Sequence, residues 1–143
     1  MAVVKADAYG HGDVEIASTL QDVGIENFAV SNIDEAIRLR EAGIKGQVLI
    51  LGYTAIKRAK ELYDYDITQV LISEEYAERL ANMSYPIKCQ FAIDTGMNRI
   101  GLPSYAITNC EQIIRKYYNS NLVLNGNFTH LCAADTVDGN VSL

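Results

Sequence analysis

The sequence has few basic residues and no long apolar run. Its 143 residues include 12 Lys and Arg against 18 Asp and Glu, a formal net charge of −6. This balance argues against nucleic-acid recognition, because binding a phosphate backbone requires clustered Lys and Arg. No apolar segment approaches the roughly 20 residues that span a bilayer, and no charged-then-apolar leader opens the sequence. We therefore expect no membrane contact from this segment.

Cysteine is also scarce. Cys89, Cys110 and Cys132 are widely spaced and form no CxxC pair. An odd count in this arrangement favours neither a disulfide framework nor a zinc site, and it is typical of a reducing compartment. We expect a cytoplasmic location, either of the protein or of a cytoplasmic domain in a longer membrane-attached protein. The cysteines are interpreted as small hydrophobic residues of the core.

The remaining composition is that of one folded domain, with 49% hydrophobic and 21% charged residues. Short apolar runs punctuate the chain, and four of them recur about every 20 residues, the length of a strand, a loop and a helix. The runs are Ala2–Val4, Phe28–Val30, Val48–Leu51, Val70–Ile72, Cys89–Ile93 and Leu122–Leu124, the last continuing towards Phe128.

Helical patterns lie between the apolar runs. Asn32 is a predicted N-cap with Glu35 at the third helical position, and Gly43 is the predicted stop. Further helices are predicted over 13–23, 54–63, 73–82 and 104–118. Ser73 and Ser104 are the expected N-caps of the last two.

Strands that are apolar on both faces and alternate with helices indicate a parallel sheet covered by helices. The candidates are a doubly wound open sheet and a TIM-type (β/α)8 barrel. The absence of GxGxxG and GxxxxGK[ST] removes the best reason to choose a nucleotide-binding open sheet. About six βα units are present, and six cannot close a barrel built for eight. We therefore expect one of two explanations: either the sheet is open by design, or these 143 residues are part of a longer protein.

Lys5 ends the first apolar run, and barrel enzymes place their chemistry at the carboxyl ends of the strands. A desolvated lysine amine at such a position can form a Schiff base. The simpler alternative is a lysine that extends to solvent. Tyr9 and His11 follow in a turn flanked by glycines, which brings their side chains to the same mouth.

Three strings together resemble the alanine racemase family, barrel enzymes that use pyridoxal 5′-phosphate (PLP). AVVKADAYGHG at 2–12 resembles the family's cofactor-attachment motif. DTGMNRIG at 94–101 resembles its DTGMxRxG segment, and NFTHLCAAD at 127–135 resembles its FTHxxxAD segment. They occur in the family's order and at about its separations.

The resemblance assigns a role to each site residue. Lys5 would form the internal aldimine with PLP and act as one of two acid/base groups at the substrate α-carbon. Tyr9 would donate a hydrogen bond to the cofactor phosphate, and His130 would lie against the pyridine ring. Arg99 would contact the phenolic oxygen and help to seat the substrate carboxylate, two anions that suit its guanidinium fork. His11 and Asp94 are interpreted as structural residues.

The implied function is PLP-dependent racemisation of L-alanine to D-alanine, or of L-serine to D-serine, for peptidoglycan precursor supply. Residues 1–143 would be a partial PLP-binding barrel domain of a homodimeric protein. The family's C-terminal β-domain, which donates the second catalytic tyrosine across the dimer interface, lies outside this sequence. We therefore expect residues 1–143 alone to be inactive. Many members carry a carbamylated lysine where this chain has Ala92, so a chloride or a carboxylate would have to replace that anion beside Arg99.

Three other interpretations remain at this point. One is a non-catalytic PLP-binding barrel for cofactor homeostasis, whose lysine motif lacks AYGHG. Another is a PLP-dependent decarboxylase on a similar barrel, which lacks DTGMxRxG. The last is a truncated product that neither binds nor catalyses.

Overall fold

The computed structural model describes residues 1–118 and 120–133. Strands and helices alternate along this part of the chain, and two short 3₁₀ turns, η1 and η2, precede helices. The elements are β1 (Ala2–Val3), α1 (Lys5–Gly10), α2 (Asp13–Asp22), β2 (Asn27–Val30), α3 (Ile33–Glu41), β3 (Gln47–Ile50), η1 (Ile56–Arg58), α4 (Ala59–Asp64), β4 (Thr68–Leu71), α5 (Glu74–Ala81), β5 (Ile87–Asp94), β6 (Leu102–Pro103), η2 (Ser104–Ala106), α6 (Ile107–Tyr117) and β7 (Leu122–Thr129).

The strands form one parallel sheet in the order β1-β2-β3-β4-β5, with β6 and β7 also paired to β5. Ile93 of β5 pairs with Leu102 of β6 and with Thr129 of β7, so β6 and β7 lie on opposite sides of β5. Each of the six apolar runs overlaps a strand of this sheet, and three of them extend one residue beyond its end. The parallel sheet and its alternation with helices are confirmed, and they make an arc of an α/β barrel.

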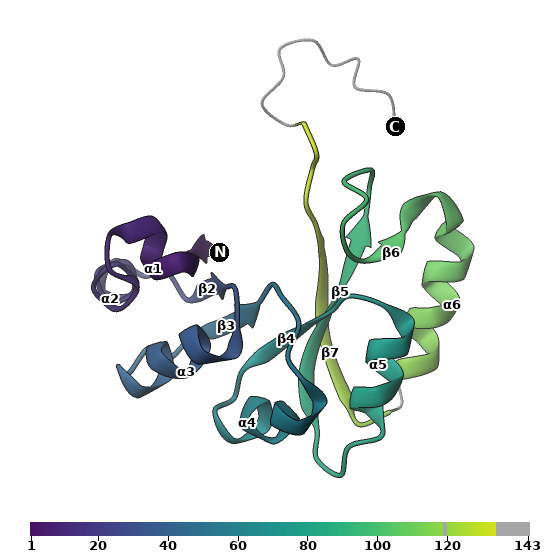
Figure 1. Cartoon of the computed structure of the whole chain (residues 1–143), viewed down its shortest axis with the longest axis horizontal. Coiled ribbons are helices and arrows are strands. Elements are labelled where there is room, and N and C mark those ends of the chain that lie inside the picture. Colours follow the sequence, from purple (N-terminus) through teal and green to yellow (C-terminus); the bar gives the residue numbers. More distant parts are fainter. Residues whose placement is uncertain (119, 134–143) are drawn as a thin grey trace.

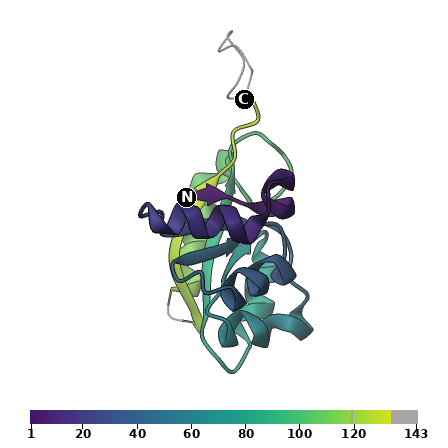
Figure 2. The ribbon, with the colours of Figure 1, turned by 90° about the vertical axis from the view of Figure 1, so that its left-hand side faces the viewer.

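The helices lie along the outer side of this arc, following one another from α2 to α6 (Figure 1). Viewed from the N-terminal side, β1, α1 and α2 lie in front of the sheet (Figure 2). Alternate strand residues pack against the helices, among them Phe28, Ile50 and Phe91, which are at most 1% exposed. The residues between them face the inside of the arc, and Leu49 and Val70 are equally buried there. Burial on both faces explains why the strands are continuous apolar runs.

Two predicted helix starts are confirmed. The Asn32 side chain accepts hydrogen bonds from the backbone N–H groups of Asp34 and Glu35, and the Ser73 side chain accepts one from Tyr76. The Glu35 carboxylate does not complete a capping box. Its two oxygens instead accept from the backbone N–H groups of Ser31 and Ala6.

Two other helix starts are wrong. The predicted N-cap Ser104 lies in η2, and α6 starts three residues later at a position without a side-chain cap, because the preceding residues pair with β5 as β6. The helix predicted from Thr54 begins with η1 at Ile56. The backbone of Thr54 is held out of the helix by the Tyr76 hydroxyl, which donates to the Thr54 carbonyl at 2.7 Å.

The prediction of three core cysteines is wrong for one of them. Cys89 and Cys110 are buried, and burial raises the pKa of the Cys89 thiol. Cys132 is exposed because it follows β7, beyond the part of that strand that pairs with β5. All three are free thiols.

Arg40 of α3 ties together the loops that precede β3 and β4. Its guanidinium donates to five backbone carbonyls at 2.7–3.0 Å, those of Ile44, Lys45, Gly46, Tyr65 and Asp66. These loops lie at the amino ends of the strands, so a single side chain braces the end of the barrel opposite the carboxyl ends.

Candidate functional site

A pocket of about 390 Å³ opens at the carboxyl ends of the strands. It is lined by Val3, Lys5, Tyr9, Ser31, Leu51, Gly52, Ala92, Ile93, Asp94, Met97, Arg99, Ile100, Phe128, Thr129 and His130. Several of these residues alternate along their strands, because side chains two apart point to the same side of a sheet. The pocket therefore continues the inner face of the arc.

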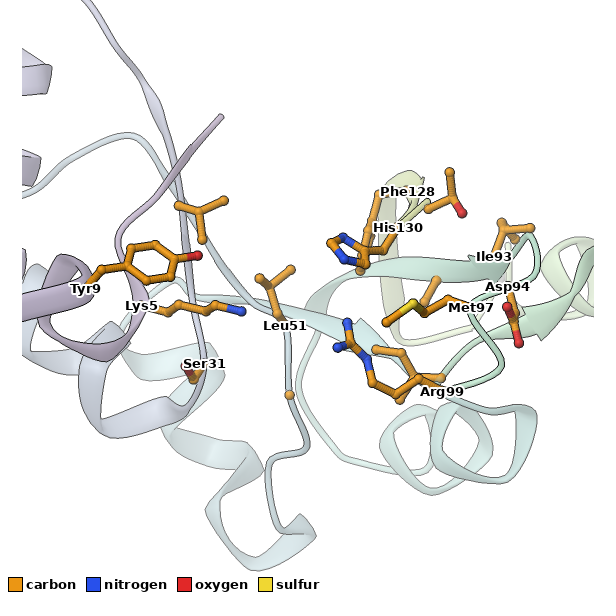
Figure 3. A pocket seen from close by; sticks show the side chains of 15 residues that line it. Lys5, Tyr9, Ser31, Leu51, Ile93, Asp94, Met97, Arg99, Phe128 and His130 are labelled. Carbon is orange, nitrogen blue, oxygen red and sulfur yellow. The ribbon is translucent and has the colours of Figure 1, made fainter. Parts of the chain in front are cut away.

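All four residues that the sequence predicts for the site line this pocket. Lys5 and Tyr9 enter it from one side, with the amine and the phenol directed towards its centre (Figure 3). Arg99 and His130 enter from the opposite side, and the guanidinium points back towards the lysine (Figure 3). Residues far apart in sequence thus converge on one space. We call the side with Lys5 and Tyr9 the lysine wall and the side with Arg99 and His130 the arginine wall.

The lysine wall is formed by α1, which is a single turn of left-handed helix. Ala6, Asp7, Ala8 and Tyr9 have φ values of 52°, 56°, 50° and 56°, although none of them is glycine. This conformation costs an L-residue roughly 1–2 kcal/mol, so it requires support from the surroundings. It reverses the chain within a few residues and presents both Lys5 and Tyr9 to the pocket.

Side chains on both flanks support this turn. His11 Nδ1 lies 2.9 Å from the Ala8 carbonyl, and the Asp7 carboxylate accepts from the backbone N–H of Asp13 at 3.1 Å. The carboxylate of Asp13 is itself buried, and it accepts two hydrogen bonds from the guanidinium of Arg38 in α3. The contact of His11 with Ala8 supports its expected role in shaping the turn, but His11 is not among the residues that line the pocket, so the expectation that its side chain reaches the same mouth as Tyr9 is wrong.

The arginine wall begins with a loop that Asp94 organises. The Asp94 carboxylate accepts from the backbone N–H groups of Gly96 at 3.0 Å and Asn98 at 2.9 Å. These bonds stabilise the ionised form and hold the pKa of Asp94 below its ordinary value. The expected structural role of Asp94 is confirmed. Arg99 comes directly after Asn98, whose backbone Asp94 holds in place.

Gly101 closes the loop against the sheet. Its N–H donates to the Ile72 carbonyl at 3.0 Å, and its φ of 112° lies where L side chains are strained. A Cβ at this position would lie 2.7 Å from the Ala92 carbonyl oxygen. The loop can approach β5 this closely only because residue 101 has no side chain.

Ala92 places a methyl group where many racemases of the resembled family carry a lysine. It is buried on β5 and lines the pocket. Within the described ranges, no ion pair involves Arg99, whose side chain projects into the pocket. The guanidinium is thus left with its hydrogen-bonding fork available for an anion.

β7 completes the arginine wall. Phe128 and His130 line the pocket, and the Thr129 hydroxyl lies 2.7 Å from the Thr95 hydroxyl, which joins the end of β7 to the Asp94 loop. The last two residues of the FTHxxxAD resemblance, Ala134 and Asp135, lie outside the described residues.

Several other residues line the pocket without a predicted role, including Ser31, Leu51, Met97 and Phe128. Ser31 follows a buried strand just as Lys5 does, and its place at a strand end is the signal that predicts it. Met97 and Phe128 lie within the DTGMxRxG and FTHxxxAD strings, whose resemblance assigns them no role. Leu51 carries no chemical group that distinguishes it from a core residue.

The arrangement combines an amine, a phenol and a guanidinium with apolar walls. A pocket of this volume is within the range of small-molecule sites, and its polar groups can hold anionic oxygens while the amine faces the centre. Among the described residues there is no group of three or more acidic, histidine or cysteine side chains that could hold a metal ion. In the same ranges, no helix combines the length and the apolar character needed to cross a membrane.

Residues 1–142 match the protein family described as alanine racemase, N-terminal domain. This match covers all three strings on which the resemblance rests.

Individual racemases are also similar to the chain. The chain is 45% identical over 138 residues to a serine/alanine racemase of Enterococcus gallinarum, with 96% of this chain and 19% of that protein covered. It is 42% identical over 142 residues to an alanine racemase of Carboxydothermus hydrogenoformans, covering 96% of this chain and 38% of that protein.

A crystal structure of alanine racemase from Enterococcus faecalis superposes with a TM-score of 0.89 at 34% identity, covering 96% of this chain and 38% of that one. The chain therefore spans between about a fifth and two fifths of the length of these proteins.

Proposed function

The chain belongs to the alanine racemase family, as its N-terminal barrel part, and on that premise we propose that the protein racemises a small amino acid, alanine or serine, with PLP as cofactor. The observation that carries the proposal is the convergence of Lys5, Tyr9 and Arg99 on one pocket. Two of the strings that supply these residues lie about 90 positions apart in sequence.

The residues present fit PLP. The pocket offers one lysine amine, a phenol that can donate to a phosphate oxygen, and a guanidinium fork for a second anionic oxygen. The aliphatic and aromatic side chains of Leu51 and Phe128 provide apolar surface for a flat ring. When bound, PLP supplies an electron sink that stabilises negative charge on the substrate α-carbon.

In this proposal Lys5 has two tasks. Its Nζ would hold the cofactor, and once the substrate amine has replaced it there, the freed lysine amine would take the α-proton from the substrate or return it on one face. Tyr9, at the other end of the same turn, anchors the phosphate. Arg99 holds a carboxylate or phenolate oxygen from the opposite wall, which fixes the direction in which the α-proton points. His130 packs beside the ring.

A labelling experiment tests the assignment of Lys5. The 143-residue protein is incubated with PLP, reduced with borohydride and digested, and the pyridoxyl group is mapped by mass spectrometry. We expect the label on Lys5, with exposed Lys57 and Lys60 as internal references for nonspecific reaction. The matched variant Lys5→Arg keeps the charge without the reactive amine and should lose the label. Label confined to surface lysines would overturn the proposal.

A second measurement addresses the reaction. L-Alanine and L-serine are incubated with the PLP-loaded protein in D₂O, and α-deuteration and formation of the D-isomer are followed separately. We expect α-deuteration above that given by free PLP, and we expect it to be absent from Lys5→Arg. We expect no D-isomer above that formed with free PLP, because the second catalytic tyrosine that the resemblance implies lies outside residues 1–143. Exchange at the same rate in both proteins would show that Lys5 does not move the proton.

A further inference from the structure

The sheet stops supporting the chain just before the lysine of the pocket. β1 is two residues long, and the last backbone bond that ties this segment to β2 runs from the Val4 N–H to the Ala29 carbonyl at 2.9 Å. Lys5 and the left-handed turn follow beyond that bond. The direction of the lysine side chain therefore depends on what holds the first residue of the turn, Ala6.

Ala6 is held by a carboxylate from another element. Its N–H donates to Oε1 of Glu35 at 3.1 Å, while Oε2 of the same carboxylate accepts from the Ser31 N–H at 2.7 Å. Ala6 and Ser31 follow two neighbouring strands, β1 and β2. One side chain thus connects the carboxyl ends of both strands at the edge of the pocket.

Glu35 is well placed to act as such a brace. It lies in the first turn of α3, and its own backbone N–H is bonded to the capping side chain of Asn32 at 3.0 Å. Among the described residues it takes part in no ion pair, whereas the adjacent Asp34 pairs with Arg58 at 2.8 Å. Both oxygens of Glu35 are therefore used by the backbone around the pocket.

We propose that Glu35 is a positioning residue, whose carboxylate fixes the backbone at Ala6 and thereby directs the Lys5 amine into the pocket. The inference rests on the proposed function for the role of Lys5, but the contact itself is independent of any cofactor. A carboxylate is suited to this task because it accepts at both oxygens and donates at neither.

Glu35→Gln isolates this property. Glutamine has the same shape but only one accepting oxygen, and its amide nitrogen cannot accept from an N–H. The Ser31 bond is shorter and more local, so the amide oxygen should keep it, and the amide nitrogen should then face Ala6. Asp34→Asn is the matched control, because it removes the same charge from the same helical turn at a side chain that is 76% exposed.

The first measurement is amide hydrogen exchange in the protein without PLP. We expect the Ala6 amide to exchange about tenfold faster in Glu35→Gln, the factor associated with loss of a charge-assisted hydrogen bond. Exchange in Asp34→Asn should equal that of the unaltered protein. Equal Ala6 exchange in both variants would overturn the proposal.

The second measurement reports the orientation of the lysine. After loading with PLP, the adduct on Lys5 should show visible circular dichroism because the side chain holds the chromophore in one direction. We expect Glu35→Gln to lose most of this signal per adduct and Asp34→Asn to keep it. A signal retained in Glu35→Gln despite faster Ala6 exchange would show that the contact does not direct Lys5. Absence of any Lys5 adduct in the unaltered protein would instead refute the proposed function, and the exchange measurement would still decide whether Glu35 holds Ala6.

Discussion

The two walls of the pocket reach a similar result by different means. The lysine wall is a strained left-handed turn, and carboxylates and an arginine outside it hold it in place, with Glu35 and Arg38 both supplied by α3. The arginine wall consists of the end of β7 and a loop that bonds mainly to itself through Asp94 and fits against β5 through Gly101. The comparison indicates that the lysine wall should respond to changes in distant side chains. The arginine wall should respond to changes within its own loop.

Gly101→Ala should give the largest effect and break the arginine wall. The added Cβ meets the Ala92 carbonyl oxygen at 2.7 Å and adds to the strain of φ 112°. We expect the free energy of unfolding to fall by about 2–4 kcal/mol in urea denaturation, since backbone must move to relieve the contact.

Gly24→Ala is the control for that variant. Gly24 also has a positive φ, of 91°, but a Cβ there would meet nothing within 4 Å. It should cost only the conformational penalty of about 1–2 kcal/mol. Equal losses in the two variants would mean that the close approach to Ala92 contributes nothing.

Asp13→Asn tests whether the lysine wall depends on support from outside. The change removes the charge from a side chain that is 4% exposed and pairs with Arg38, whose side chain is 52% exposed. Because solvent around Arg38 screens the pair, we expect the free energy of unfolding to fall by only about 1–2 kcal/mol.

Asp64→Asn provides the reference, because it breaks the exposed pair of Asp64 with Lys60, which solvent screens, and should change the free energy of unfolding much less than Asp13→Asn. Hydrogen exchange should also increase at the Asp13 amide, which bonds to the turn. If Asp13→Asn and Asp64→Asn behave alike, the turn does not rely on this ion pair.

Asp94→Asn should give the smallest effect, a local loss of the hydrogen bonds that order the loop of the arginine wall. The folded-state pKa of Asp94 is depressed, so the stabilisation is fully present above the ordinary aspartate pKa of about 3.9 and is lost as pH falls through the lower folded value. The protection of the Gly96 and Asn98 amides, measured against the intrinsic exchange rate at each pH, should therefore fall on acidification in the unaltered protein. In Asp94→Asn this protection should already be low at neutral pH, with that of the Ala6 amide unchanged. A matching change at Ala6 would show that the walls are coupled.

Much of the fold could be predicted from the sequence because the strands are buried on both faces. Phe28–Val30 and Val48–Leu51 are apolar at every position, and the caps at Asn32 and Ser73 mark where helices begin. β6 was not predicted, because two residues paired to the end of β5 carry no periodic signal. The four site residues came from motif strings, and the structure brings them to one pocket.

The support of the lysine wall could not be predicted. Nothing in Ala6, Asp7 or Ala8 indicates a left-handed turn, since such residues adopt it only when tertiary contacts outweigh its cost. The pattern around Glu35 correctly indicated a helix start, but it could not reveal that the carboxylate bonds to Ala6, 29 positions earlier.

The clamp formed by Arg40 has a consequence for the order in which the molecule folds. Three of its five carbonyl partners, in the loop between α3 and β3, lie only 4 to 6 positions away, so they can be bound while the chain is still largely open. Such short-range contacts form quickly, whereas contacts such as that of Ala6 with Glu35, 29 positions apart, or of Thr95 with Thr129, 34 positions apart, must close longer loops. We expect the segment from α3 to β3 to assemble early and these contacts of the pocket walls to form on it later. A defect in either wall should then change the unfolding rate more than the folding rate.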